Sequence, residues 1–167
     1  MSDQVLVGND VVDLLDIAGF DMSAVAEVRS TRLPKGRYHL RCEEAKLEAI
    51  ESKKDGQPVK KPGVKFVLDV TNVVQLVDDR DNPPPADPTI LVGKKHIETF
   101  FITDPAQDLG RIKAFMVDCG YTGAGTLQEM LADFVGTQFD AVIAHRKNKD
   151  DPDIVYVNID RSKIKPL

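Results

Sequence analysis

The sequence has no tryptophan, only two cysteines, and no apolar run of the length that crosses a membrane. A membrane-spanning helix needs about 20 predominantly apolar residues in succession, so we expect no membrane association. Cys42 and Cys119 are too few and too far apart for a disulfide framework or a zinc knuckle, which is typical of a reducing cytosol. The first residues also lack the basic and apolar regions of a signal peptide. Together these absences predict a cytoplasmic protein.

Residue patterns that are typical of catalysis are lacking as well. The 3 histidines stand apart, without the HxH or HExxH spacing of metal sites, and the cysteines form no CxxC motif. The glycine-rich segment 120–126 has no lysine of the kind that a P-loop uses, and its glycines fit a turn between helices. Neither cysteine has a motif partner for nucleophilic catalysis. We therefore expect no metal, no cofactor and no enzymatic activity.

Charge is distributed unevenly along the chain. It holds 22 basic and 27 acidic residues, for a net charge of -5. Residues 1–30 contain six of the acidic side chains against Arg29 alone, so the rest of the chain is neutral overall. A polyanionic ligand needs only a local basic groove, because salt screens exposed charges beyond about 8–10 Å. An acidic chain can therefore still bind nucleic acid.

The N-terminal segment, residues 1–32, is expected to be an acidic extension separate from a domain over residues 33–167. Residues 10–17 place aspartates at positions 10, 13 and 16 on one helical face and apolar residues largely on the other, which predicts a helix. Two roles are open for this helix. It either packs its apolar face on the domain, or it docks replication or recombination proteins and competes with phosphate for basic loops.

Alternating apolar residues and β-branched residues predict five strands in the domain, at about 37–50, 64–76, 94–103, 137–144 and 153–160. Residues 44–50 are also compatible with a helix. Two helices are expected between the third and fourth strands, beginning at Pro105 and at the capping box of Thr126 and Glu129. The order β-β-β-α-β-β is that of the oligonucleotide/oligosaccharide-binding (OB) barrel. We therefore predict a mainly β fold, a five-stranded OB-type barrel.

Two basic clusters fall at the connections that would hold a nucleic-acid strand in such a barrel. In the OB fold the ligand crosses strands two and three, and the 1–2 and 4–5 loops clamp it. Residues 51–62 lie at the first connection, where Pro58 and Pro62 are expected to exclude regular pairing. Residues 145–151 lie at the second, where nearby aspartates partly offset the charge. The predicted phosphate contacts are Lys53, Lys54, Lys60, Lys61, Lys65, Arg146, Lys147 and Lys149.

Binding with little sequence preference also needs flat side chains on which bases stack, worth about 1–3 kcal/mol per base. Tyr156 is expected to face outward if the valines of the last strand face the core. Phe100 and Phe101 are adjacent and point to opposite faces of their strand. Phe100 shares its face with His96 and Glu98, so we expect it to be the outward residue. Tyr156 and Phe100 are the predicted stacking residues.

Five segments resemble a family of small phage and prophage proteins taken to be single-stranded DNA-binding proteins of OB fold: 20–25, 33–38, 93–94, 109–115 and 134–136. The resemblance covers most of residues 20–160. It implies noncatalytic coating of single strands during phage DNA replication or recombination, in the cytoplasm of a host cell. Many single-strand binders end in an acidic tail that recruits partners, whereas this chain ends in the basic segment 160–167. Either recruitment is missing or the acidic N-terminus does that work.

The predicted function is therefore noncatalytic binding of single-stranded DNA with little sequence preference. The alternative is a structural or adaptor protein of a phage replication complex or virion, which would bind proteins through the N-terminal helix or the proline-rich segment 78–88. A third interpretation is an accessory nuclease or recombinase subunit, which metal-dependent cleavage of an oligonucleotide would reveal. Preference for DNA over RNA and assembly into a homo-oligomer stay open.

Overall fold

The computed structural model describes residues 4–7, 10–13, 18–19, 21–24, 32–54 and 56–167. The chain forms two compact units, Met1–Ser30 and Thr31–Leu167. In the first unit, β1 (Gln4–Val7) pairs antiparallel with β2 (Asp10–Asp13). The helix predicted over 10–17 is thus wrong for residues 10–13, and residues 14–17 lie outside the described part. Val5 lies opposite Val12, and β-branched residues favour strand pairing over a helix.

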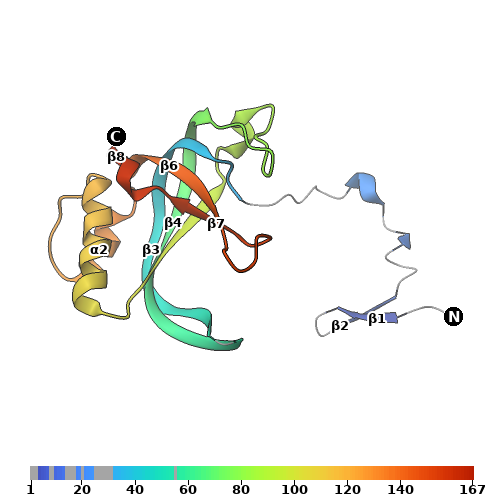
Figure 1. Ribbon diagram of the computed structural model, residues 1–167, viewed down its shortest axis with the longest axis horizontal. Coiled ribbons are helices and arrows are strands. Elements are labelled where there is room, and N and C mark those ends of the chain that lie inside the picture. Colours follow the sequence, from blue (N-terminus) through green and yellow to red (C-terminus); the bar gives the residue numbers. More distant parts are fainter. Residues whose placement is uncertain (1–3, 8–9, 14–17, 20, 25–31, 55) are drawn as a thin grey trace. The chain divides into compact units, whose positions relative to one another are not determined.

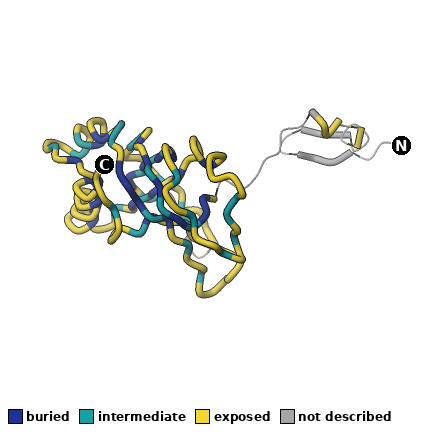
Figure 2. The backbone as a smooth tube through the Cα atoms, turned by 90° about the horizontal axis from the view of Figure 1, so that it is seen from above, coloured by how far each residue is buried: buried dark blue, intermediate teal, exposed yellow. Residues whose placement is uncertain are grey.

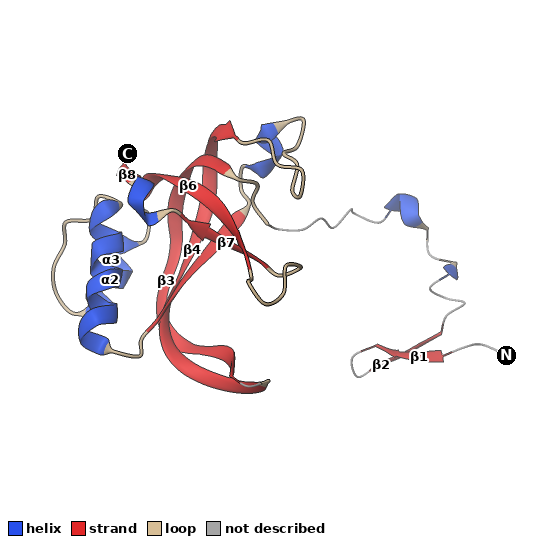
Figure 3. Cartoon of the chain, viewed as in Figure 1, coloured by secondary structure: helices blue, strands red, loops and turns tan. Residues whose placement is uncertain are grey.

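The second unit is mainly β, as predicted, and its sheet has six antiparallel strands. The strands are β3 (Gly36–Lys54), β4 (Gln57–Leu76), β5 (Lys95–Phe101), β6 (Gln138–Lys147), β7 (Val155–Ile159) and β8 (Lys165–Pro166). Hydrogen bonds join them in the order β5-β4-β3-β6-β7, and β8 pairs with β6. Strand β3 is therefore the centre of the sheet (Figure 3).

The sheet is open between β5 and β7, because the described residues form no backbone ladder between these two strands. A side chain of β5 bridges the two strands instead. Glu98, on β5, is 2 % exposed, and its Oε1 accepts a hydrogen bond from the backbone N–H of Ile159 at 2.8 Å. His96 Nε2 lies 2.8 Å from the same oxygen, and Arg161 Nη2 lies 3.4 Å from Oε2. Ile159 is the last residue of β7, so Glu98 ties the end of that strand to β5.

Strands β3 and β4 form one long hairpin, where a loop over residues 51–62 was expected. The pairing continues to Lys54 and Gln57, which lie on either side of the turn. Gly56, in this turn, has a φ of 76°. Pro62 lies opposite Ala49 and Pro58 opposite Lys53, so the prolines do not exclude pairing. No other strand of the described residues pairs with this end of the hairpin. Proline is tolerated on such edges because its missing N–H is not needed there.

We call residues 49–54 and 57–62, which pair only with each other as strands, the β3–β4 ribbon. In Figure 1 the two strands bend together and extend past the rest of the sheet. The predicted first and second strands were therefore correct in position but too short.

The core lies between the sheet and two helices, α2 (Pro105–Asp118) and α3 (Leu127–Phe134). Both helices stand between β5 and β6 in the chain, as predicted, and the capping box of Thr126 and Glu129 is confirmed. Five phenylalanines pack together at centroid distances of 5.1 to 6.3 Å: Phe66, Phe100, Phe115, Phe134 and Phe139. In Figure 2 the buried residues, in dark blue, are concentrated within the second unit.

Candidate nucleic-acid interface

The connection between β6 and β7 gathers four of the predicted binding residues around one hollow. Arg146, Lys147, Asn148, Lys149 and Tyr156 line it, and its volume is about 350 Å³. Tyr156 is 41 % exposed and faces outward, as predicted. The Arg146 guanidinium lies 5.7 Å from the centroid of its ring. An aromatic face and three cations therefore share one surface, which we call the Tyr156 hollow.

The backbone of this connection is held by its own polar side chains. Asn148 Oδ1 accepts hydrogen bonds from the N–H groups of Asp150 at 2.8 Å and Asp151 at 3.3 Å. Asn148 Nδ2 donates to the Tyr156 hydroxyl at 2.9 Å, and the Asn148 N–H donates to the Ile154 carbonyl at 2.9 Å. A single asparagine thus fixes both the turn and the tyrosine, and the hollow is preorganised for a ligand.

The cations of the hollow differ in how far they are neutralised. Lys147 Nζ lies 2.9 Å from Asp81, and this hydrogen bond raises the pKa of the lysine. Both side chains are exposed, so water screens the pair strongly. Within the described residues, no carboxylate lies at ion-pair distance from Arg146 or Lys149. Arg146 and Lys149 are therefore the cations available to a phosphate.

The lysines of the first predicted cluster do not form one surface. Lys60 and Lys61 are neighbours on β4, so their side chains point to opposite faces of the β3–β4 ribbon. Lys65 lies further along β4, 3.9 Å from Glu48. Lys53 and Lys54 pair through their backbones with Pro58 and Gln57, and their side chains lie outside the described part. In Figure 1 the ribbon and the β6–β7 connection both lie on the side away from α2.

The prediction that Phe100 faces outward is wrong. Its side chain is 5 % exposed and packs on Phe66 and Phe115, and the Arg161 guanidinium covers the ring at 3.9 Å. His96 and Glu98 do share its face, but that face is buried, because their polar groups pair with each other. The polar residues that looked solvated form a hydrogen-bonded pair inside the protein. Phe100 is thus no surface for base stacking.

The exposed aromatic of β5 is the neighbouring residue, Phe101, at 40 %. Ile97 lies on the same outer face at 51 %. The ladder register places Ile97 opposite Val67 and Phe101 opposite Gly63 on β4. The outer face of β4 and β5 therefore carries a small apolar surface, and its aromatic residue is Phe101, where Phe100 was expected.

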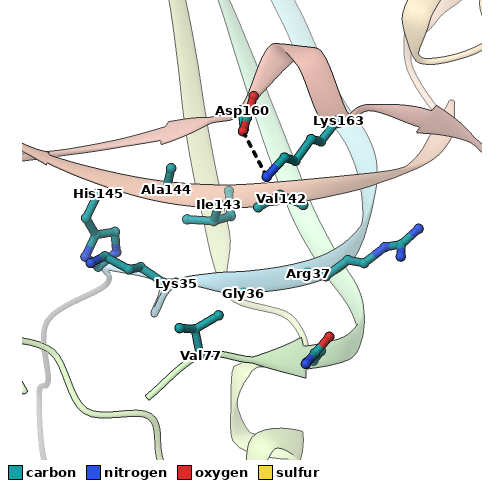
Figure 4. A pocket seen from close by; sticks show the side chains of 11 residues that line it. Lys35, Gly36, Arg37, Val77, Val142, Ile143, Ala144, His145, Asp160 and Lys163 are labelled. Carbon is teal, nitrogen blue, oxygen red and sulfur yellow. Dashed lines mark ion pairs between the residues drawn. The ribbon is translucent and has the colours of Figure 1, made fainter. Parts of the chain in front are cut away.

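A second basic surface, which the sequence interpretation missed, lies on the outer face of the sheet across β4, β3 and β6. There a pocket of about 360 Å³ has Lys35, Arg37, His145 and Lys163 around an apolar floor that includes Val142. Figure 4 shows Lys35 and His145 at one end, Arg37 at the other, and the ion pair of Lys163 and Asp160 between them. Lys35 also pairs with Asp79, at 3.1 Å. The missed signal is the alternation of Arg37, His39 and Arg41 along one strand.

Two kinds of reactive site, a metal centre and a reactive thiol, can be judged from the described residues. No group of three or more histidine, cysteine, aspartate or glutamate side chains there is placed to hold a metal ion. Both cysteines are buried, and burial raises the pKa of the Cys42 thiol to about 12 and raises the pKa of Cys119 as well. A thiol with a raised pKa is a poor nucleophile. None of the described helices is both long and apolar enough to span a bilayer.

A scan against models of protein families gives no match, and a search of curated proteins finds none that matches the chain. The interpretation of these surfaces therefore depends on their chemistry alone.

Proposed function

We propose that this protein binds single-stranded DNA with little sequence preference and catalyses no reaction, in phage DNA replication or recombination. The observation that carries the proposal is the Tyr156 hollow, where an exposed aromatic ring stands among Arg146, Lys147 and Lys149. A ring and cations on one preorganised turn match the two features that all single strands share, which are flat bases and a phosphate backbone. Neither feature depends on the base sequence.

The strand pairing supports an OB-type arrangement for this function. In the predicted barrel the first strand pairs with the second and fourth, and the β3–β4 and β3–β6 ladders have this pattern. The fifth strand would close the barrel against the third, and here Glu98 joins β5 to β7 by a side chain. The OB-fold is a partly open barrel whose 1–2 and 4–5 loops bind oligonucleotides. The β3–β4 ribbon and the Tyr156 hollow correspond to these two loops.

Fluorescence anisotropy with labelled oligo(dT), duplex DNA and RNA at two salt concentrations tests the proposal. We expect oligo(dT) to bind more tightly than the duplex, because only unpaired bases can stack on Tyr156. If about four to six phosphates are contacted, log K should fall with log salt at a slope of roughly −3 to −4. A flat salt response, or equal affinity for duplex and single strand, would contradict the proposal.

The outer face of β4 and β5 favours one alternative, an adaptor that binds proteins of a replication complex or virion. Lys95 on this face pairs with Asp69 at 2.6 Å and also with Glu43. Its charge is thus balanced, while Ile97 and Phe101 stay exposed. Such a surface suits a protein partner better than a phosphate backbone. The adaptor function predicts no measurable affinity for any oligonucleotide in the same titration.

A further inference from the structure

The outer face of β3 carries a row of basic side chains separate from the Tyr156 hollow. Arg37, His39 and Arg41 occupy alternate positions of the strand, so all three point to one face. Tyr38, Leu40 and Cys42 occupy the positions between them and are fully buried, which identifies the basic face as the outer one. Arg41 is exposed, and no carboxylate of the described residues lies at ion-pair distance from it.

A buried carboxylate stands beside this row. Asp140 lies on β6, directly opposite His39 in the ladder, and its side chain is 7 % exposed although the position belongs to the outer face. Its Oδ1 accepts a hydrogen bond from Arg37 Nε at 2.7 Å, and its Oδ2 lies 3.4 Å from His39 Nε2. One aspartate therefore contacts two neighbouring members of the row.

The contact with Asp140 leaves the two terminal nitrogens of the Arg37 guanidinium free to bind a ligand. Asp140 engages only Nε, and no acceptor of the described residues lies within hydrogen-bond distance of the two terminal nitrogens. The side chain is 41 % exposed. An arginine fixed at Nε presents its other N–H groups as a planar fork, the geometry that binds a phosphate through two parallel hydrogen bonds.

The spacing of the row suits a polynucleotide backbone. Alternate residues of a strand are roughly 6.7 Å apart, twice the rise per residue. One strand of B-DNA advances ~3.4 Å for each phosphate, so an extended strand, or alternate phosphates of a stacked one, can follow such a row. The pocket at the Arg37 end adds Lys35 and Lys163, each of which is paired with an aspartate (Figure 4). Within the described residues, the unpaired cation of the row is thus Arg41 and the partly paired one is Arg37.

We propose that Arg37, His39 and Arg41 form a phosphate-binding track on the outer face of β3, and that Asp140 is the positioning residue that holds the Arg37 fork toward the ligand. The inference rests on the proposed function and adds to it a second surface, on the central strand of the sheet. Bound DNA then contacts both the β6–β7 connection and the face of β3.

Two variants that each remove one negative charge test whether Asp140 positions Arg37 or whether DNA binding simply follows the net charge of the protein. Asp140→Asn makes the protein one unit more positive, so attraction alone predicts tighter binding of oligo(dT). The track predicts weaker binding, by roughly three- to tenfold, because the Arg37 fork is no longer held by a charged partner. Asp160→Asn is the matched control, since it removes a carboxylate that pairs with Lys163 in the same pocket. We expect no weakening from it.

Arg37→Lys tests the fork without changing charge. The track predicts roughly three- to tenfold weaker binding, because an ammonium group cannot make two parallel hydrogen bonds. Arg111→Lys is the control, because Arg111 is an exposed arginine on α2 that also lies beside an aspartate, at 3.6 Å. It should bind as the unaltered protein does. Thermal unfolding of each variant shows that the affinities compare folded proteins.

The outcomes are separable. If the unaltered protein binds oligo(dT) and neither Arg37→Lys nor Asp140→Asn binds more weakly than its control, the track is wrong while the proposed function stands. If the unaltered protein binds no oligonucleotide, the track and the proposed function are both wrong. If poly-glutamate displaces oligo(dT) from the unaltered protein at equal charge concentration and loses this ability in Arg37→Lys, the track binds acidic peptides, and the nucleic-acid assignment is overturned.

Discussion

The β6–β7 connection and the β3–β4 ribbon carry similar numbers of basic residues, but only the connection arranges them into a site. In the connection, Asn148 orders the turn, and Arg146 lies over Tyr156. In the ribbon, Lys60 and Lys61 point to opposite faces, and the two strands lie beyond the rest of the sheet. The difference teaches that basic residues become a binding site when hydrogen bonds and neighbouring strands fix where they point.

The largest effect is expected at Glu98, which ties β7 to β5. Glu98→Ala should lower the free energy of unfolding by about 3 kcal/mol, because it leaves the Ile159 N–H and the Arg161 charge without their buried partner. Urea denaturation measures this change. Glu48→Ala, at the base of the ribbon, removes only an exposed carboxylate 3.9 Å from Lys65 and should change stability by less than about 0.5 kcal/mol. If Glu98→Ala and Glu48→Ala lower the free energy of unfolding equally, the β7 end of the sheet is held no more firmly than the base of the β3–β4 ribbon, and the comparison fails.

The next largest effect is expected at Tyr156. Tyr156→Ala should weaken oligo(dT) binding by about 1–3 kcal/mol, the value of one stacked base. Tyr156→Phe is the matched control, because it keeps the ring and loses only the hydroxyl bonded to Asn148. We expect it to retain most of the affinity in an anisotropy titration. If Tyr156→Phe is as weak as Tyr156→Ala, the hydroxyl contact is responsible and stacking is not.

The two neighbouring lysines of the ribbon should give unequal and smaller effects. Lys61 shares its face with Lys65 and with the outer face of the sheet, whereas Lys60 lies on the other face. Lys61→Ala should therefore reduce the salt slope of binding by about 0.7, the value of one phosphate contact on a single strand. Lys60→Ala should leave the slope unchanged. Equal slopes for both variants would mean that the ribbon contributes only diffuse attraction.

The smallest effect is expected at Asp81, which pairs with Lys147 at 2.9 Å. Asp81→Ala frees this lysine for phosphate and removes one negative charge beside the Tyr156 hollow. Binding of oligo(dT) at low salt should become tighter, by about threefold or less, since both side chains are exposed. Asp78→Ala removes an equal charge at a position without an ion pair among the described residues. If Asp81→Ala and Asp78→Ala tighten oligo(dT) binding equally, the gain comes from the lost negative charge alone and not from freeing Lys147 of its ion pair.

The positions of the strands and helices could be predicted because local patterns determine them. Alternating apolar residues located all five predicted strands, and the Thr126 capping box located α3. The length of the β3–β4 hairpin could not be predicted, because Pro58 and Pro62 are excluded only from central strands and nothing in the sequence says that this end is an edge. The strand over residues 10–13 was mistaken for a helix, since aspartates three residues apart fit a helical face as well.

The orientation of β5 could not be predicted from composition. His96 and Glu98 looked solvated because charged residues are rarely buried unless they pair. They contact each other within β5, but the other partners of Glu98, Ile159 and Arg161, follow only about 60 residues later in the chain. The same limitation hid Arg37 and Asp140, which meet only after β3 and β6 pair. Tyr156 was placed correctly because its neighbours Val155 and Val157 define the strand face locally.

Photo-crosslinking of a single-stranded oligonucleotide with 5-bromodeoxyuridine at every position tests the central claim most directly. After irradiation and proteolysis, mass spectrometry identifies the peptides joined to DNA. We predict a crosslink at Tyr156, which unlabelled oligo(dT) suppresses and duplex DNA does not. Crosslinks confined to other peptides, with Tyr156 recovered unmodified at saturating oligonucleotide, would contradict the assignment of the hollow as the binding site.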